Sequence, residues 1–412
     1  MDEIKELDLA GLEQIVASGG AAIRRIQRLQ PAGGVGDKVF PSTYEGGQYA
    51  LEDRVVDGRR VPCALLDSVQ AQANRMELAL KSAFYRGKRA EADIPVLTVD
   101  FATAGLSEVG DITSLDAPHR MADAILRDSL LDGQPFRVTP VGKSLDTASA
   151  ANATDLYGFC PTALIFGLWD STGPRGGSGT KFQRALVSEI VGVDVAQGVR
   201  PSSRLDPLGI ELNAGKIFQS PDGWTLSESM ANREKDRPVL FGKEGKPSEI
   251  NHGNVTPSLK NEKGQFHHGG ITMLHAQQSV VLSLPALRRL SFPDGAGEIT
   301  TRRDLSARTA LAALALAGAH LSIASGCDLR SRCLLLPDPE APADWEVVGM
   351  NGRASRVHIA DPCALVVQAA AAAQAHGLPA WRSMPIVLNP KADLVELVRR
   401  SRALRSAEPV QG

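Results

Sequence analysis

A polar segment at residues 201–265 interrupts a sequence that is otherwise apolar enough to build a core. The segment is rich in Gly, Pro, Asn, Lys and Glu and has almost no apolar periodicity, and such a stretch does not bury a core of its own. Regular apolar patterns return on both sides of it. We therefore expect one compact core, built from residues 1–200 and 266–412, with residues 201–265 inserted between its two parts.

Strand and helix patterns alternate in both flanks of this segment. Apolar residues recur at steps of three and four from Val69 to Ala83, which predicts an amphipathic helix within residues 65–87. The alternation favours an α+β or α/β fold over an all-helical one. Further strands are predicted at 94–101, 162–171, 270–287, 332–337 and 345–350, and further helices at 119–133, 181–195, 309–326 and 364–377.

Composition and charge exclude several classes of protein. The chain has a formal net charge of −2, so nucleic-acid binding would require a local basic surface rather than overall basicity. The most apolar run, residues 309–326, is interrupted by Gly318 and His320 and is expected to be a buried helix rather than a membrane span. The N-terminus lacks the pattern of a signal peptide, and the five cysteines are widely spaced. We expect a cytoplasmic protein with no membrane partner, no metal site and no cofactor.

The stretch FGLWDSTGPRGGSGTKFQRAL, residues 166–186, resembles a nucleotide-binding P-loop but departs from it. Gly173 and Gly179 are six positions apart, one more than in a P-loop, and Thr180 and Lys181 stand in the reverse of the required order. Nucleotide hydrolysis is therefore disfavoured, but glycines let backbone amides approach a phosphate at the start of the predicted helix. Residues 171–188 carry three basic residues and no acidic one. The alternative is an exposed hairpin or crossover that binds nothing. The candidates for phosphate contact are Gly176, Gly177, Gly179, Arg175, Lys181 and Arg184.

Two further polar stretches are candidates for binding. The helix predicted at 65–87 carries Gln72, Asn74 and Arg75 on its polar face, which is either an ordinary solvated face or a surface for RNA. The segment RPSSRLDPLGI holds two arginines that either contact phosphates or pair with Asp206 or Glu211. These arginines are Arg200 and Arg204.

The chain resembles the backbone subunit of type I-G (formerly I-U) CRISPR surveillance complexes (Cascade), a family of the repeat-associated mysterious protein (RAMP) superfamily. The resemblance rests on VFPSTY, LLDSVQAQANRMELAL, ALIFGLWDSTGPRGGSGTKFQRALVSEIVGVD, RPSSRLDPLGI and GGITM taken in this order, and covers about residues 37 to 400. It implies an α+β fold with a ferredoxin-like palm of the RNA-recognition-motif type. Residues 1–200 would form the first part of the palm with finger insertions, residues 201–265 a thumb, and residues 266–412 the second part of the palm.

The resemblance also implies a non-catalytic role in antiviral defence. Copies of the subunit would bind CRISPR RNA along its spacer, form a helical filament and present the guide for pairing with target DNA. The other partners would be the large subunit, the RAMP subunit that processes the guide, and a recruited nuclease-helicase. The RNA-binding residues implied by the matching motifs are Gly176, Gly177, Gly179, Lys181, Arg184, Arg175, Gln72, Asn74, Arg75, Arg200 and Arg204.

Two other functions stay open from the sequence. A RAMP-type endoribonuclease would need an acid and a base near the RNA, for which His119, His267 and His268 are candidates. A P-loop-like nucleotide-binding protein would bind a nucleotide with magnesium, against which the order of Thr180 and Lys181 argues.

Overall fold

The chain forms two compact units in the computed structural model, which describes residues 4–171, 173, 179–260, 264 and 268–407. The first unit comprises Met1–Tyr44, Tyr49–Val195 and Met273–Glu396. The second comprises Glu45–Gln48, Ala196–Thr272 and Leu397–Gly412. The fold is α+β, with a large sheet in which antiparallel pairs predominate.

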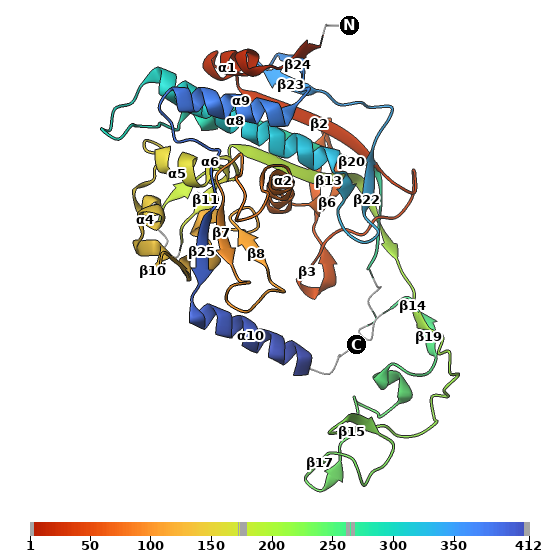
Figure 1. Cartoon of the computed structure of the whole chain (residues 1–412). Coiled ribbons are helices and arrows are strands. Elements are labelled where there is room, and N and C mark those ends of the chain that lie inside the picture. Colours follow the sequence, from red (N-terminus) through yellow and green to blue (C-terminus); the bar gives the residue numbers. More distant parts are fainter. Residues whose placement is uncertain (1–3, 172, 174–178, 261–263, 265–267, 408–412) are drawn as a thin grey trace. The chain divides into compact units, whose positions relative to one another are not determined.

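A ten-stranded sheet is the centre of the first unit (Figure 1). Strand β22 (Leu334–Pro337) pairs with β2, and β21 (Cys327–Asp328) pairs with β22. The other strands follow the order β1 (Lys5–Glu6), β24 (Ala354–His358), β23 (Trp345–Val348), β2 (Ala22–Pro31), β20 (His268–Ser283), β13 (Leu186–Val199), β6 (Arg59–Asp67) and β5 (Leu51–Val56).

Four helices pack together on this sheet, and α8 (Thr301–Ala324) touches the other three. They are α1 (Leu9–Ala17), α2 (Val69–Phe84) and α9 (Pro362–Ala375). Along β2 the residues alternate, so that Ile23 and Leu29 are buried and Ile26 is 43% exposed on the opposite face. Helix α8 is long and apolar enough to cross a membrane by length and composition, but most of it is buried inside the protein, as predicted.

The ends of α2 show why its sequence forms a helix there. The Ser68 hydroxyl caps the N-terminus by accepting a hydrogen bond from the Ala71 amide at 3.2 Å. Met76 and Leu80 are buried on the predicted apolar face. The helix ends at Phe84, and Gly87 follows with a φ of 109°.

A five-stranded sheet and several short helices complete the first unit. The sheet has the order β10 (Gln134–Pro135), β9 (Ser129–Leu131), β25 (Ile386–Pro390), β7 (Leu97–Asp100) and β8 (Asp111–Thr113). The short helices are α3 (Ala124–Arg127), α4 (Pro140–Thr147), α5 (Thr154–Phe159), α6 (Pro161–Phe166) and α7 (Leu284–Arg288). Helix α10 (Ala392–Ala407) ends the described chain.

The second unit is built from small hairpins. Its strands are β14 (Ser202–Arg204) paired with β19 (Val255–Ser258), β15 (Phe218–Ser220) with β16 (Gly223–Thr225), and β17 (Arg233–Glu234) with β18 (Arg237–Pro238). Among the described residues of this unit, Ile217, Phe218, Ala231 and Ile271 are buried apolar residues.

The helices predicted at 65–87, 309–326 and 364–377 are confirmed, as are the strands at 94–101, 270–287, 332–337 and 345–350. Three predictions are wrong. Residues 119–133 form short helical turns and a strand, because Arg120 has a φ of 53° and Asp123 caps a new helix. Residues 162–171 begin as the buried helix α6 rather than as a strand, which an uninterrupted apolar run does not distinguish.

The third error concerns residues 181–195, which form strands and not a helix. Phe182, Leu186 and Ile190 fit a helical spacing, but Leu186, Ser188 and Ile190 alternate with less buried neighbours, as in a strand. The Val-rich composition of 187–195 also favours a strand.

Candidate nucleic-acid interface

The glycine-rich loop is carried by a β-hairpin. Strand β11 (Leu168–Trp169) pairs antiparallel with β12 (Lys181–Phe182), and Trp169 stands opposite Lys181. The Lys181 ammonium lies 4.6 Å from the centre of the Trp169 ring, and Trp169 is 52% exposed. This hairpin therefore offers an aromatic face and a positive charge side by side, the combination on which single-stranded nucleic acids stack.

The hairpin corrects the P-loop interpretation. Because β12 and then β13 follow the loop, the helix predicted to start there is wrong, and the loop does not lead into a helix N-terminus as a P-loop does. Gly179 is half-buried, and Lys181 and Arg184 are exposed. The other predicted loop residues, Arg175, Gly176 and Gly177, lie outside the described residues.

The base of the hairpin is fixed by a buried ion pair. The Arg120 guanidinium donates to both carboxylate oxygens of Glu77, at 2.7 and 2.8 Å, and to the Gly167 carbonyl at 2.9 Å. Gly167 has a φ of 88°, and a Cβ there would lie 3.1 Å from the Phe182 carbonyl oxygen, so this turn requires glycine. Helix α2, which carries Glu77, thereby positions the hairpin.

Burial sets the charge balance around this pair. Burial raises the pKa of Glu77 to about 7, and the nearby Arg120 guanidinium opposes the rise. Arg184 lies close enough to this ion pair for its charges to act on it. Burial lowers the pKa of Arg184, and the positive charge of Arg120 lowers it further. Arg184 therefore adds positive potential at the base of the hairpin.

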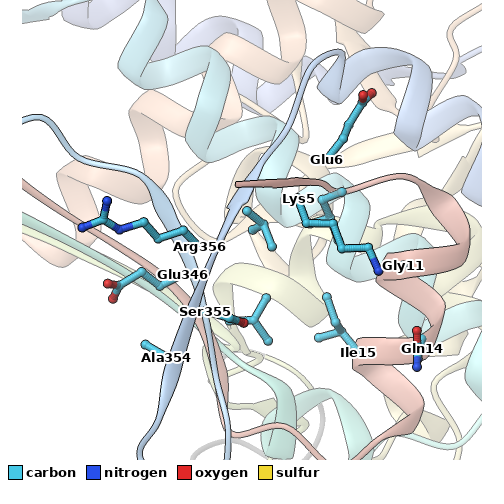
Figure 2. Close-up of a pocket in the computed structure, with 12 residues that line it drawn as sticks. Lys5, Glu6, Gly11, Gln14, Ile15, Glu346, Ala354, Ser355 and Arg356 are labelled. Atoms are coloured by element: carbon cyan, nitrogen blue, oxygen red, sulfur yellow. The ribbon is translucent and has the colours of Figure 1, made fainter. Parts of the chain in front are cut away.

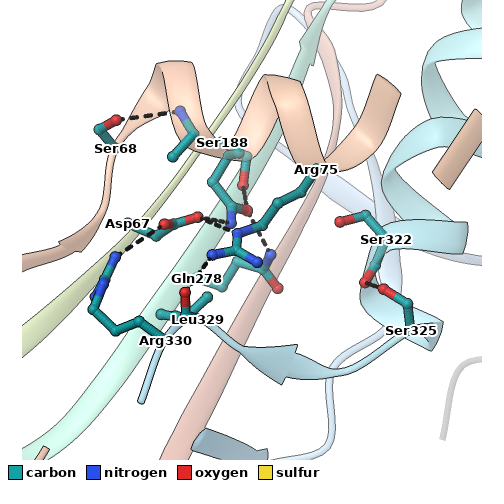
Figure 3. A network of polar contacts seen from close by, with 11 residues as sticks. Asp67, Ser68, Arg75, Ser188, Gln278, Ser322, Ser325, Leu329 and Arg330 are labelled. Atoms are coloured by element: carbon teal, nitrogen blue, oxygen red, sulfur yellow. Dashed lines mark hydrogen bonds and ion pairs between the residues drawn. The ribbon is translucent and has the colours of Figure 1, made fainter. Parts of the chain in front are cut away.

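A second basic cluster surrounds the carboxylate of Asp67, at the end of β6 (Figure 3). Asp67 is buried and accepts from Arg75 Nε at 2.9 Å and from Arg330 Nη2 at 3.5 Å. Arg75 Nη2 also donates to the Leu329 carbonyl at 2.8 Å. Two partly exposed guanidinium groups thus share one carboxylate, which leaves one positive charge in excess.

One donor of this cluster is unused. Arg330 Nη1 is buried and has no hydrogen-bond partner among the residues that the structure describes. A buried donor without a partner carries a free-energy penalty that an oxyanion would remove. Since Nη1 itself is covered, a phosphate oxygen would approach the cluster at the exposed parts of the Arg75 and Arg330 side chains.

The buried Gln72 side chain links Asp67 to two neighbouring strands through hydrogen bonds. Its amide Nε2 donates to Asp67 at 2.7 Å, and its Oε1 accepts from Ser188 Oγ at 2.8 Å and from Gln278 Nε2 at 2.9 Å. Gln72 is only 2% exposed, so its predicted direct contact with RNA is replaced by a positioning role. Asn74, the next predicted residue on α2, is exposed.

Arg332 extends the cluster onto the surface. Its guanidinium carbon lies 4.1 Å from the centre of the Phe40 ring, and its carbonyl accepts from the Phe40 amide at 3.0 Å. We call Arg75, Arg330 and Arg332 the arginine cluster. The sequence analysis missed Phe40, Asp67, Arg330 and Arg332, although VFPSTY was one of the motifs behind the resemblance.

Arg332 also has a φ of 60°, which costs a non-glycine residue about 1 kcal/mol. We expect Arg332→Gly to keep the free energy of unfolding within about 1 kcal/mol of wild type, because the relieved strain offsets the lost cation–π contact. Urea unfolding followed by circular dichroism checks this. A loss of several kcal/mol would mean that Arg332 is structural and not a free binding group.

The second unit contains the remaining predicted arginines. Arg200 is exposed. Arg204 Nη2 lies 3.4 Å from Asp206 Oδ1, so the predicted alternative of pairing with Asp206 is what the structure shows for this residue.

Of the three histidines proposed for a ribonuclease, the structure describes the side chain of His119. His119 is exposed, and its backbone amide donates to Asp123 Oδ2 at 3.1 Å. His267 and the side chain of His268 lie outside the described residues.

A pocket of about 620 Å³ lies away from both basic surfaces, between α1 and the β1, β23 and β24 edge of the sheet (Figure 2). Ile15 and Ser355 face each other across it, and the ionisable residues on its walls are Lys5, Glu6, Glu346 and Arg356. These charges balance, so the pocket has no electrostatic preference for nucleic acid.

Comparison with known proteins points to a CRISPR-associated family. Residues 23–197 match a family model described as CRISPR-associated protein GSU0053. The match covers α2, the hairpin of β11 and β12, and most of β13, which carry the Trp169, Lys181 and Arg75 side chains. No curated protein matches the sequence. The match covers less than half of the chain, and over these residues the protein is similar to a CRISPR-associated family.

Proposed function

We propose that this chain is the backbone subunit of a type I-G surveillance complex and binds the guide RNA through its first unit. The observation that carries the proposal is the arginine cluster. Among the described residues, Asp67 is the one carboxylate that pairs with both Arg75 and Arg330. Arg330 Nη1 is buried and has no hydrogen-bond partner among these residues. Such an excess of guanidinium charge suits the phosphates of a nucleic-acid backbone.

The fold supports the proposal at a coarser level. A mixed sheet with helices packed on it is compatible with a ferredoxin-like palm, and the small hairpins of the second unit suit a thumb. In this proposal the protein neutralises phosphates and pre-orders the guide, so that base pairing reads the target DNA. The subunit itself performs no catalysis, and its partners are CRISPR RNA, target DNA, further copies of itself, the other Cascade subunits and the recruited nuclease-helicase, all in the cytoplasm.

The test is binding of the purified chain to labelled single-stranded RNA across a salt series. If each subunit contacts about five phosphates, affinity should fall roughly a hundredfold between 50 and 200 mM salt. Particles that grow with RNA length, and RNA that remains intact, would support the filament. Binding that does not respond to salt would contradict the proposal, and cut RNA would favour the endoribonuclease.

The arginine cluster is tested separately by Arg330→Gln. Asp67 keeps Gln72 and Arg75 as partners in this variant, so the fold should persist. We expect the salt slope of RNA binding to fall by about one phosphate contact. Arg289→Gln is the control for the loss of one positive charge, because Arg289 is exposed and lies after α7, outside the cluster. Equal losses in both variants would mean that only overall charge matters.

A further inference from the structure

A smaller pocket in the first unit collects positively charged groups that the proposed function does not use. It has a volume of about 230 Å³. Its walls come from β2, from the C-terminal end of α8, and from β23 and β24 with the residues just before β23. The polar and ionisable residues that line it are Arg25, His320, Asp344, Trp345 and His358.

Arg25 gives this pocket an unused donor. Arg25 Nη2 donates to Gln27 Oε1 at 2.6 Å. Arg25 Nη1 is buried and has no partner among the residues that the structure describes. Leaving this donor without a hydrogen bond is costly, and because Nη1 is covered, the guanidinium would have to rotate towards the pocket to donate to a ligand there.

We propose that this pocket binds a small dianionic oxyanion of the phosphate class, held by Arg25 and by His320 and His358. Arg25 supplies the permanent charge, and each imidazole adds a donor when it is protonated. A pocket of this volume admits a phosphate or a small phosphomonoester but not a folded nucleic acid. Nothing in the guide-binding proposal depends on this site.

The groups that face the pocket explain why the ligand should be an anion. Burial lowers the pKa of His320, and the charges of Arg25 and His358 lower it further, so this end of the pocket has positive potential without a ligand. The acidic residue in the lining, Asp344, lies 3.7 Å from Arg356, which takes up part of its charge. Near Arg25, burial raises the pKa of the Cys327 thiol, so this group stays neutral.

A dianion fits this set better than a carboxylate does. Arg25 supplies a positive charge, and burial together with the charges of Arg25 and His358 lowers the pKa of His320. A bound dianion offsets these neighbouring charges and favours protonation of the half-buried His320 imidazole more than a singly charged carboxylate does. Phosphate binding should therefore raise the pKa of His320.

The test uses the full chain with inorganic phosphate as the probe. Titration calorimetry should give saturable binding, and the imidazole NMR signal of His320 should titrate at a higher pH when phosphate is present. Arg25→Gln should weaken binding about tenfold or more. Arg24→Gln is the control, because Arg24 is the neighbouring residue on the opposite face of β2 and pairs with Glu346 at 2.8 Å.

Three outcomes would overturn the inference. Phosphate that leaves the His320 signal unchanged would show that the pocket is not its site. Equal losses in Arg24→Gln and Arg25→Gln would reduce the effect to surface charge. Acetate binding as tightly as phosphate would make this a carboxylate site and not a dianion site. If Arg25→Gln fails to fold, His320→Asn, at the half-buried position on α8, provides the same comparison.

Discussion

Arg120→Ala is expected to lower the free energy of unfolding by about 3–5 kcal/mol, because it leaves the Glu77 carboxylate buried without its ionic partner. The Gly167 carbonyl at the base of the hairpin loses its donor in the same step. Urea unfolding monitored by circular dichroism measures the change. Lys81→Ala is the matched control, since the Lys81–Asp116 pair is only partly buried and should contribute less than about 1 kcal/mol.

The pH dependence of this loss identifies its cause. Burial already raises the pKa of Glu77 to about 7, and removal of Arg120 raises it further. A carboxyl whose folded pKa exceeds its unfolded pKa destabilises the protein more as pH rises between the two values. The deficit of Arg120→Ala should therefore be largest above about pH 7 and shrink towards pH 5, where Glu77 is protonated in the folded state.

A double variant distinguishes a lost ion pair from lost packing. Glu77→Leu with Arg120→Leu removes both charges, so no charge stays buried alone, and it should be more stable than Arg120→Ala. If the double variant is as unstable as the single one, shape and not charge explains the loss. Arg120 would then matter for its unusual φ of 53° and its packing on Phe166.

Near the site, the sequence predicted α2 and α8 correctly but took the strand β13 for a helix. The steps of three and four in α2 and the apolar composition of α8 define helices by themselves, since each buries a face or its whole surface against neighbours. Leu186 and Ile190 fit both periods, and the pairing of β13 with β6, where Ile190 stands opposite Asp67, decided for the strand. The sequence pattern of residues 181–195 alone does not distinguish a strand from a helix.

The candidate site could likewise be predicted only where its residues lie close together in the sequence. Lys181 and Arg75 could be found because each lies in a recognisable motif. The arginine cluster could not, because the Arg75–Leu329 hydrogen bond joins residues 254 positions apart. Trp169 had a signal that was not used: the chain has only four tryptophans, and this one stands directly before the glycine-rich loop.

Trp169→Ala combined with Lys181→Glu is expected to weaken single-stranded RNA binding about a hundredfold. Stacking of one base on an aromatic ring contributes about 1–3 kcal/mol, and reversal of a charge beside it adds repulsion of the phosphates. Fluorescence anisotropy at fixed salt measures the affinity. The melting temperature should change little, because Trp169 is 52% exposed and Lys181 pairs mainly with its ring.

The aromatic control separates stacking from a general effect of the hairpin. Trp169→Phe keeps a ring on β11 and should retain most of the affinity, whereas Trp169→Ala should not. If Trp169→Phe and Trp169→Ala bind alike, the ring does not stack on a base, and only the charge of Lys181 remains as a contact. If the double variant binds as wild type does, the hairpin lies outside the guide path and the arginine cluster must carry RNA binding alone.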